Sequence, residues 1–145
     1  NDYGEDLHSH VSCGRPLGLR LRENWLYVAD AYYGILKVDI RTGEKKQLVS
    51  SNDKRLGPAP MKLTNDLDLD GDLIYFIDSS YERDINEAVE EHMEALPRGR
   101  LFSYNEKTDK IEFLLENLYF PNGLQLMPDK DAILINEDSM ARIIK

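Results

Sequence analysis

The sequence contains little cysteine, little positive charge and no long apolar run. Its single cysteine, Cys13, cannot form an internal disulfide, so the cysteine count does not indicate a cellular compartment. Basic residues number 18 against 27 acidic residues. The net charge of −9, without a cluster of Lys or Arg, argues against a nucleic-acid backbone or an anionic membrane surface as the main partner. A neutral or positively charged ligand is easier to accommodate.

The longest uninterrupted apolar run covers residues 73–77, whereas a membrane-spanning helix needs about 20 apolar residues. The first residues have no signal-peptide character. We therefore expect no transmembrane segment and no targeting signal in this sequence. Because the chain starts with Asn1 rather than Met, we expect it to be part of a longer protein, with Cys13 either a free thiol or bonded to a cysteine outside this segment.

One pattern recurs three times, with a period of about fifty residues that is typical of propeller blades or solenoid units. Each copy opens with alternating apolar residues, such as Leu19 and Leu21, and continues through a polar turn into a denser apolar run. This pattern is typical of a β-hairpin. A second hairpin follows in the first two copies, at residues 35–49 and 100–115. No 3.6-residue period supports a helical solenoid.

Four strands per copy, with apolar residues on both faces of the inner strands, predict blades packed between neighbouring blades. We therefore predict an all-β fold, a partial β-propeller of about two to three blades of four antiparallel strands, with one short inserted helix. Residues 1–14 are expected to be a lead segment, and residues 15–145 part of a single propeller domain. The repeat units cover about residues 15–50, 63–116 and 120–145, so the chain ends inside the third or fourth strand of its last unit.

The one clear helical pattern covers residues 81–96 and ends before Pro97. Its apolar face is formed by Ile85, Val89, His92 or Met93, and Leu96. The segment joins the second and third strands of its blade. It is either a surface helix that closes a gap or a lid over a substrate.

The acidic run TNDLDLDGD, from residue 64, has the D-x-D-x-D-G spacing with which a calcium-binding EF-hand begins. The twelfth position of such a loop must be a bidentate Glu, but it falls on Ile77, and both flanks are strands rather than helices. The EF-hand interpretation therefore fails. Asp66, Asp68 and Asp70 are expected on one side of a strand that turns at Asp70 and Gly71.

In a propeller, the loops that enter each innermost strand and those that join the second and third strands open on the same face. Asn65 and Asn122 hold equivalent positions on this face, just before the innermost strands of successive blades, and are expected to point toward the axis. An asparagine carbonyl oxygen is a hard neutral ligand that suits calcium, so the two could share one ion. The alternative is that each asparagine caps its own turn.

The same face receives four candidate residues for the rim of a substrate site: Tyr32, Tyr33, Asp78 and Glu137. The tyrosines could stack on an aromatic substrate or pack on a neighbouring blade. Two further patterns are weaker. His8 and His10 form an H-x-H in the polar lead segment, where a solvated tail is favoured over a metal site. Ser79 and Ser80 lack the nucleophile-elbow motif of a serine hydrolase.

Six ordered motifs extend from Cys13 to the end of the chain: CGRPLGLR, YVADAYYGILKVD, TNDLDLDGDLIYFIDSS, GRLFSY, LYFPNGLQL and SMARI. Together they resemble the strictosidine synthase-like family. The resemblance implies a six-bladed propeller, related in architecture to paraoxonases and gluconolactonases, in a membrane-associated or secretory-pathway protein. It also implies calcium ligands in ND and NG motifs just before an inner strand, which Asn65 in TND and Asn122 in PNG match.

The resemblance is incomplete at two places. Paraoxonases carry a histidine in a PHG motif of the preceding blade, where this chain has Leu17 in PLG, which argues against histidine-assisted hydrolysis of the paraoxonase kind. The glutamate that plant members use for Pictet–Spengler condensation belongs to a later blade, and Glu137 does not match it.

Two functions remain open. The first is a calcium-dependent hydrolase of aryl esters or lactones, which we favour because the resemblance implies esterase activity. The second is a non-catalytic propeller that binds a ligand or partner and holds a structural calcium. No catalytic residue is assigned in either case.

Overall fold

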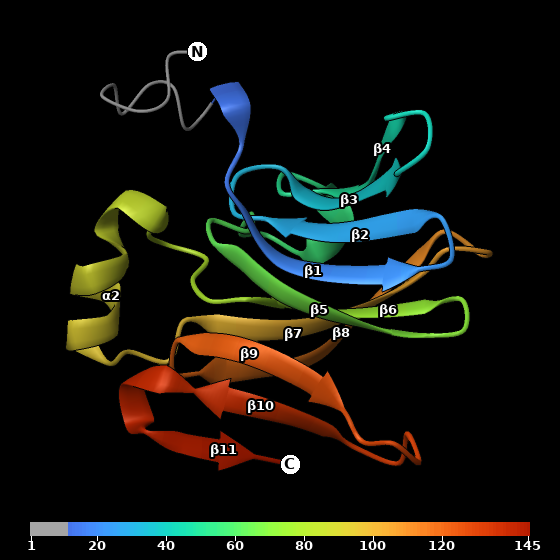
Figure 1. Cartoon of the computed structure of the whole chain (residues 1–145). Helices are drawn as coiled ribbons and strands as arrows, with labels where there is room; N and C mark the ends of the chain where they lie inside the picture. Colours follow the sequence, from blue (N-terminus) through green and yellow to red (C-terminus); the bar gives the residue numbers. More distant parts are fainter. Residues whose placement is uncertain (1–11) are drawn as a thin grey trace.

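Three antiparallel sheets make up the computed structural model, which describes residues 12–145 (Figure 1). The strands of the first sheet are β1 (Pro16–Arg22), β2 (Trp25–Asp30), β3 (Gly34–Asp39) and β4 (Lys45–Ser50). Those of the second are β5 (Thr64–Asp70), β6 (Leu73–Asp78), β7 (Gly99–Asn105) and β8 (Lys110–Leu118). The third sheet contains β9 (Pro121–Leu126), β10 (Ile133–Glu137) and β11 (Arg142–Ile144).

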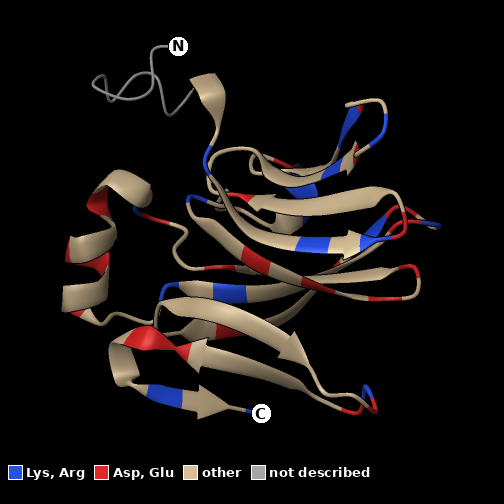
Figure 2. Cartoon of the chain, in the orientation of Figure 1, with Lys and Arg blue, Asp and Glu red and all other residues tan. Residues whose placement is uncertain are grey.

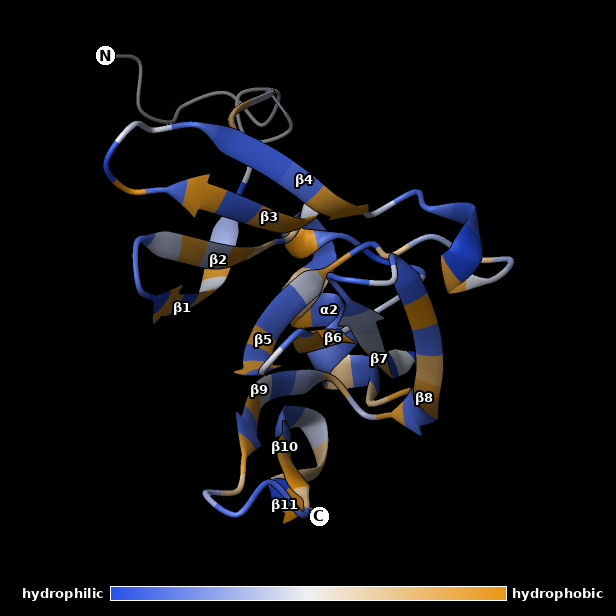
Figure 3. Ribbon diagram, turned by 90° about the vertical axis from the view of Figure 1, so that its right-hand side faces the viewer, coloured by the Kyte–Doolittle hydropathy of each residue, from blue (hydrophilic) through white to orange (hydrophobic). Residues whose placement is uncertain are grey.

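Strand order follows the chain in every sheet, so each sheet is a simple meander. The first strands of the sheets lie next to one another, because β1 contacts β5 and β5 contacts β9. Figure 3 shows these three strands one below the other on the left of the molecule, with the outer strand β4 along the top and the outer strand β8 on the right. Sheets stacked in this way are blades around an axis. The predicted all-β fold, a partial propeller with one short inserted helix, is confirmed.

The acidic run that resembles an EF-hand is strand β5. Asp70 pairs with Leu73 across a tight turn, where Gly71 has a φ of 54°, a conformation that glycine adopts without steric cost. Figure 2 shows acidic residues along this strand. Asp66 Oδ2 accepts a hydrogen bond from the backbone nitrogen of Leu124 at 2.9 Å, and Asp68 Oδ2 accepts one from that of Leu126 at 2.8 Å. These carboxylates therefore join β5 to β9 of the next blade.

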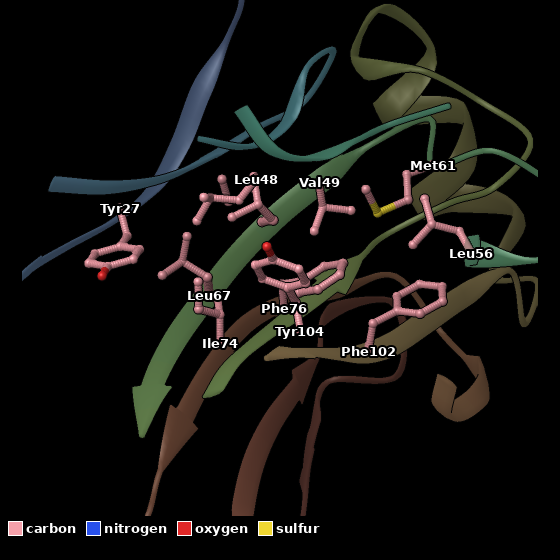
Figure 4. Close-up of a cluster of buried hydrophobic side chains, with 12 residues drawn as sticks. Tyr27, Leu48, Val49, Leu56, Met61, Leu67, Ile74, Phe76, Phe102 and Tyr104 are labelled. Atoms are coloured by element: carbon pink, nitrogen blue, oxygen red, sulfur yellow. The ribbon is translucent and has the colours of Figure 1, made fainter. Parts of the chain in front are cut away.

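The core lies between the blades rather than within any one of them. The second sheet packs on the first through a large cluster that includes Tyr27, Ile35, Val49, Leu67, Ile74, Phe76 and Phe102 (Figure 4). The rings of Phe76 and Phe102 stack with centroids 5.4 Å apart. The next residue of β6, Ile77, packs instead with Leu124 and Ile135 of the third sheet. Burial on both faces explains the continuous apolar run of β6.

The inserted helix is shorter than residues 81–96. It consists of the 3₁₀ turn η2 (Ile85–Glu87) and the helix α2 (Ala88–Glu94). Asp84 begins η2 by accepting a hydrogen bond from the backbone nitrogen of Asn86, and Ala95, with a φ of 48°, ends α2. We refer to residues 79–98, between β6 and β7, as the insertion. Among residues 12–145 no helix is both long enough and apolar enough to span a membrane.

The predicted apolar face of this helix is correct only in part, because Ile85 and His92 are partly buried but Val89 is not. Val89 and Met93 are 73% and 76% exposed, whereas Glu91 is only 2% exposed. The Glu91 carboxylate lies 2.8 Å from Arg98 Nη1 and 3.5 Å from Arg83 Nε. These ion pairs neutralise the buried carboxylate, so a charged residue lies on the packed side of the helix.

Candidate functional site

Asn65 and Asn122 contact each other. Asn65 Nδ2 donates a hydrogen bond to Asn122 Oδ1 at 3.0 Å, across the boundary between the second and third blades. In the part of the chain that the structure describes, the side-chain hydrogen bonds of this pair run to each other and to Asp138, not to their own turns. We call Asn65 and Asn122 the Asn pair. The convergence that sequence spacing indicated is thus present in the structure.

A β-bulge at the start of each innermost strand places these residues. Thr64 pairs with Asp78 and Asp66 with Ile77, which leaves Asn65 as the extra residue of β5. The pairing of β9 with β10 shifts in the same way between Pro121 and Leu124, around Asn122. In β1 the shift leaves out Leu17. A bulge re-aims the side chain of the extra residue, and bulges are frequent beside active sites. Hydrophobic alternation alone did not reveal them.

The Asn pair lies in the wall of a cleft of about 480 Å³ at this end of the innermost strands. All three blades and the insertion contribute to the lining, which includes Leu17, Arg20, Asn65, Ile85, Phe120 and Asn122. The insertion is therefore on the same face as Asn65, as the sequence predicted. The cleft combines apolar walls with a few polar groups, which is the usual composition of a small-molecule site.

The donor set fits a hard cation. A half-turn of the Asn65 amide exchanges its nitrogen and oxygen, so that both carbonyl oxygens of the pair face the same point. Calcium takes 6–8 oxygen ligands, so two amide oxygens supply part of such a shell. Within residues 12–145, no group of three or more His, Cys, Asp or Glu is placed to hold a metal ion.

Asp66 lines the same cleft, but its carboxylate is already engaged. One oxygen accepts from the backbone nitrogen of Leu67 and the other from that of Leu124, while Arg20 lies 3.3 Å away. Asp66 therefore serves the contact between blades.

The two rim tyrosines make structural contacts. Tyr32 Oη accepts a hydrogen bond from Asn86 Nδ2 of the insertion at 3.0 Å, and burial raises the pKa of its phenol. Tyr33 is 37% exposed and donates to the backbone oxygen of Ser12 at 3.0 Å. Tyr32 thus holds η2 beside the cleft from the neighbouring blade.

Asp78 and Glu137 lie beneath the rim rather than on it. Asp78 is fully buried, with Arg100 Nη2 at 2.6 Å and the backbone nitrogen of Leu63 at 3.0 Å. Burial raises the pKa of Asp78 to about 6, although Arg100 opposes the shift. Glu137 is 1% exposed and accepts from the backbone nitrogen of Tyr119 at 2.9 Å. Each carboxylate therefore fixes the segment that leads to one member of the Asn pair.

Sequence reasoning missed Asp138. Asn122 Nδ2 donates to Asp138 Oδ2 at 3.3 Å, and Asp138 begins the 3₁₀ turn η3 (Asp138–Met140) that follows β10. Asp138 lies in a loop between the second and third strands of its blade, and such loops open on the same face as the Asn pair, so its position in the sequence could have marked it. His8 and His10 lie outside the described residues.

The chain is similar in sequence to several known proteins. The chain is 44% identical over 143 residues to an adipocyte plasma membrane-associated protein of Danio rerio, covering 97% of this chain and 34% of the relative. It is 43% identical over 134 residues to the adipocyte plasma membrane-associated protein of Homo sapiens, and the match covers 90% of this chain and 32% of the human protein. A third relative, from Drosophila melanogaster, is named adipocyte plasma membrane-associated protein Hemomucin. It is 40% identical over 148 residues, and the match covers 97% of this chain and 25% of the relative. The chain thus spans about a third or less of these relatives.

Among solved structures, the tricorn protease superimposes with a TM-score of 0.52 and 14% identity, covering 88% of this chain and 11% of that one. This likeness supports the fold alone. A family model described as Strictosidine synthase matches residues 65–145, which include both members of the Asn pair. Since that match covers more than half of the chain, the chain belongs to the strictosidine synthase family.

Proposed function

We propose that the whole protein is a calcium-dependent hydrolase of aryl esters or lactones, and that this chain supplies part of its active-site opening. The observation that carries the proposal is the contact between Asn65 and Asn122, from successive blades, in the wall of a cleft lined by both apolar and polar residues. The names of the relatives, which describe plasma membrane-associated proteins, support a membrane-associated location.

The residues of this chain have separate tasks in the proposed reaction. Asn65 and Asn122 would hold the ion through their carbonyl oxygens, and Leu17, Ile85 and Phe120 would form the walls that receive an aryl group. Bound calcium would supply Lewis-acid polarisation of the substrate carbonyl and stabilisation of its oxyanion. Tyr32 fixes the insertion so that Ile85 stays in the wall.

A second function is supported by Leu17. Its side chain lies in the cleft wall, and no histidine lines the cleft in the described part of the chain. A propeller that only binds a ligand and holds a structural calcium needs no proton-transfer group, so it can have a leucine at position 17. The two functions share the calcium site and differ in whether the bound ligand reacts.

Removal of calcium from the complete protein is expected to abolish hydrolysis of phenyl acetate and of a simple aliphatic lactone. Activity should return when calcium is added back. Initial rates are measured on chelator-treated, calcium-restored and untreated protein. Calcium binding without turnover of any ester or lactone would instead favour the binding propeller, and turnover that survives chelation would contradict a calcium requirement.

Ile85→Ala is expected to raise KM for aryl esters by about tenfold or more, because a pocket that loses apolar contact loses roughly 1–3 kcal/mol of binding. KM for small aliphatic lactones should change less. Val89→Ala is the matched control, since Val89 is in the same insertion but 73% exposed. Equal KM changes for all substrates would show that Ile85 does not select among them.

A further inference from the structure

The amide of Asn122 can present either its oxygen or its nitrogen to the cleft, and only the oxygen binds a cation. An ionised carboxylate is purely an acceptor, so Asp138 can take only the NH₂ end of this amide. The distance of 3.3 Å from Asn122 Nδ2 to Asp138 Oδ2 fits that arrangement. The carbonyl oxygen of Asn122 is then turned toward Asn65.

Backbone contacts hold Asp138 near Asn122. The backbone nitrogen of Asp138 donates to the carbonyl oxygen of Phe120 at 3.1 Å, which ties η3 to the residues that precede Asn122. The buried Glu137 makes a parallel bond to Tyr119. The Asp138 side chain itself is 42% exposed, so it needs further partners to keep one orientation.

The insertion places His92 of α2 beside Asp138. His92 Nδ1 lies 3.6 Å from Asp138 Oδ2, and its ring meets Phe120 edge-on, with centroids 5.5 Å apart at 83°. Ser139 Oγ donates to the backbone oxygen of His92 at 2.9 Å. These contacts join α2 to the segment that carries Asp138.

From this geometry we propose that Asp138 is a positioning residue for the cation site, and that His92 makes its orientation depend on the docking of α2. The inference rests on the proposed calcium site of the Asn pair. Since coupling between two sites is reciprocal, calcium should also stabilise α2 in its docked position. The cleft wall that contains Ile85 and the cation site would then form together.

The test is calcium titration calorimetry on the complete protein. Asp138→Ala is expected to weaken calcium binding by about 10- to 100-fold, the usual effect of removing a residue that orients a metal ligand. His92→Ala should weaken it less. The double variant should match Asp138→Ala, because His92 acts through Asp138. Asp129→Ala, an exposed carboxylate in the β9–β10 turn, is the control for net charge and should change little.

Hydrogen exchange of residues 85–94 supplies a second measurement. Calcium should slow their exchange in the wild type and not in His92→Ala, with thermal unfolding recorded to exclude a general loss of fold. Unchanged affinity in Asp138→Ala overturns the positioning role, and unchanged affinity in His92→Ala, or exchange that calcium does not alter, overturns the link to α2. A protein that binds no calcium overturns both this inference and the proposed function. If the protein binds calcium but hydrolyses no ester, only the proposed function is wrong. The calcium affinities of the variants then still test this inference.

Discussion

Asn122→Ala and Asn65→Ala in the complete protein are each expected to reduce ester hydrolysis at a fixed low calcium concentration by about 100-fold or more. Loss of a residue that orients a metal ligand already costs about 10- to 100-fold in metal affinity or activity. Loss of a direct ligand should cost at least as much. Alanine removes the carbonyl oxygen and leaves the backbone of the bulge unchanged. Initial rates across a calcium titration measure the effect.

Asn65→Asp is the informative companion variant. Aspartate retains an oxygen at the same place and adds charge, so calcium affinity should be kept or increased. Asn52→Ala, at an exposed position after β4, is the matched control and should leave activity unchanged. If both members of the Asn pair tolerate alanine with full activity and unchanged calcium dependence, they are not part of the site.

Asp78→Ala is expected to lower the free energy of unfolding by about 3–5 kcal/mol, the usual cost of removing one partner of a buried ion pair. Arg100, only 5% exposed, would lose its carboxylate partner, and the backbone nitrogen of Leu63 would lose its acceptor. Urea denaturation of the complete protein measures the change. Activity should also fall, because Leu63 leads directly into the strand that carries Asn65.

Asp70→Ala provides the comparison for this prediction. Asp70 pairs with Lys130, but both side chains are well exposed, at 31% and 51%. Exposed ion pairs contribute about 0–1 kcal/mol, so its loss should change stability little. A similar small change in Asp78→Ala would mean that the buried pair does not hold this blade together.

The sequence predicted the parts of the fold that depend on local pattern. Alternation followed by a turn located the hairpin of β5 and β6, and equivalent positions in successive repeats brought Asn65 and Asn122 together. The first rests on a period of two along a strand and the second on the repeat of about fifty residues, and the amino-acid order displays both directly.

The features that the sequence did not reveal depend on polar contacts, which hydrophobic periodicity does not encode. Helical periodicity placed Val89 on the apolar face of the helix, but Val89 is exposed and Glu91 is buried in ion pairs with Arg83 and Arg98. The hydrogen bonds from Asp66 to β9 depend on the register between blades.

The approach of Asp138 to Asn122 depends on a bulge and a 3₁₀ turn. Hydrophobic alternation marks neither element, so the approach of the two side chains was not visible in the sequence.

The most direct test of the proposed calcium site is a crystal structure of the complete protein grown with calcium, using anomalous diffraction to locate the ion. We expect a calcium peak in the cleft, at about 2.3–2.6 Å from a side-chain oxygen of both Asn65 and Asn122. The amide nitrogen of Asn122 should face Asp138. A calcium ion bound elsewhere, or an Asn pair still joined by its own hydrogen bond at saturating calcium, would contradict it.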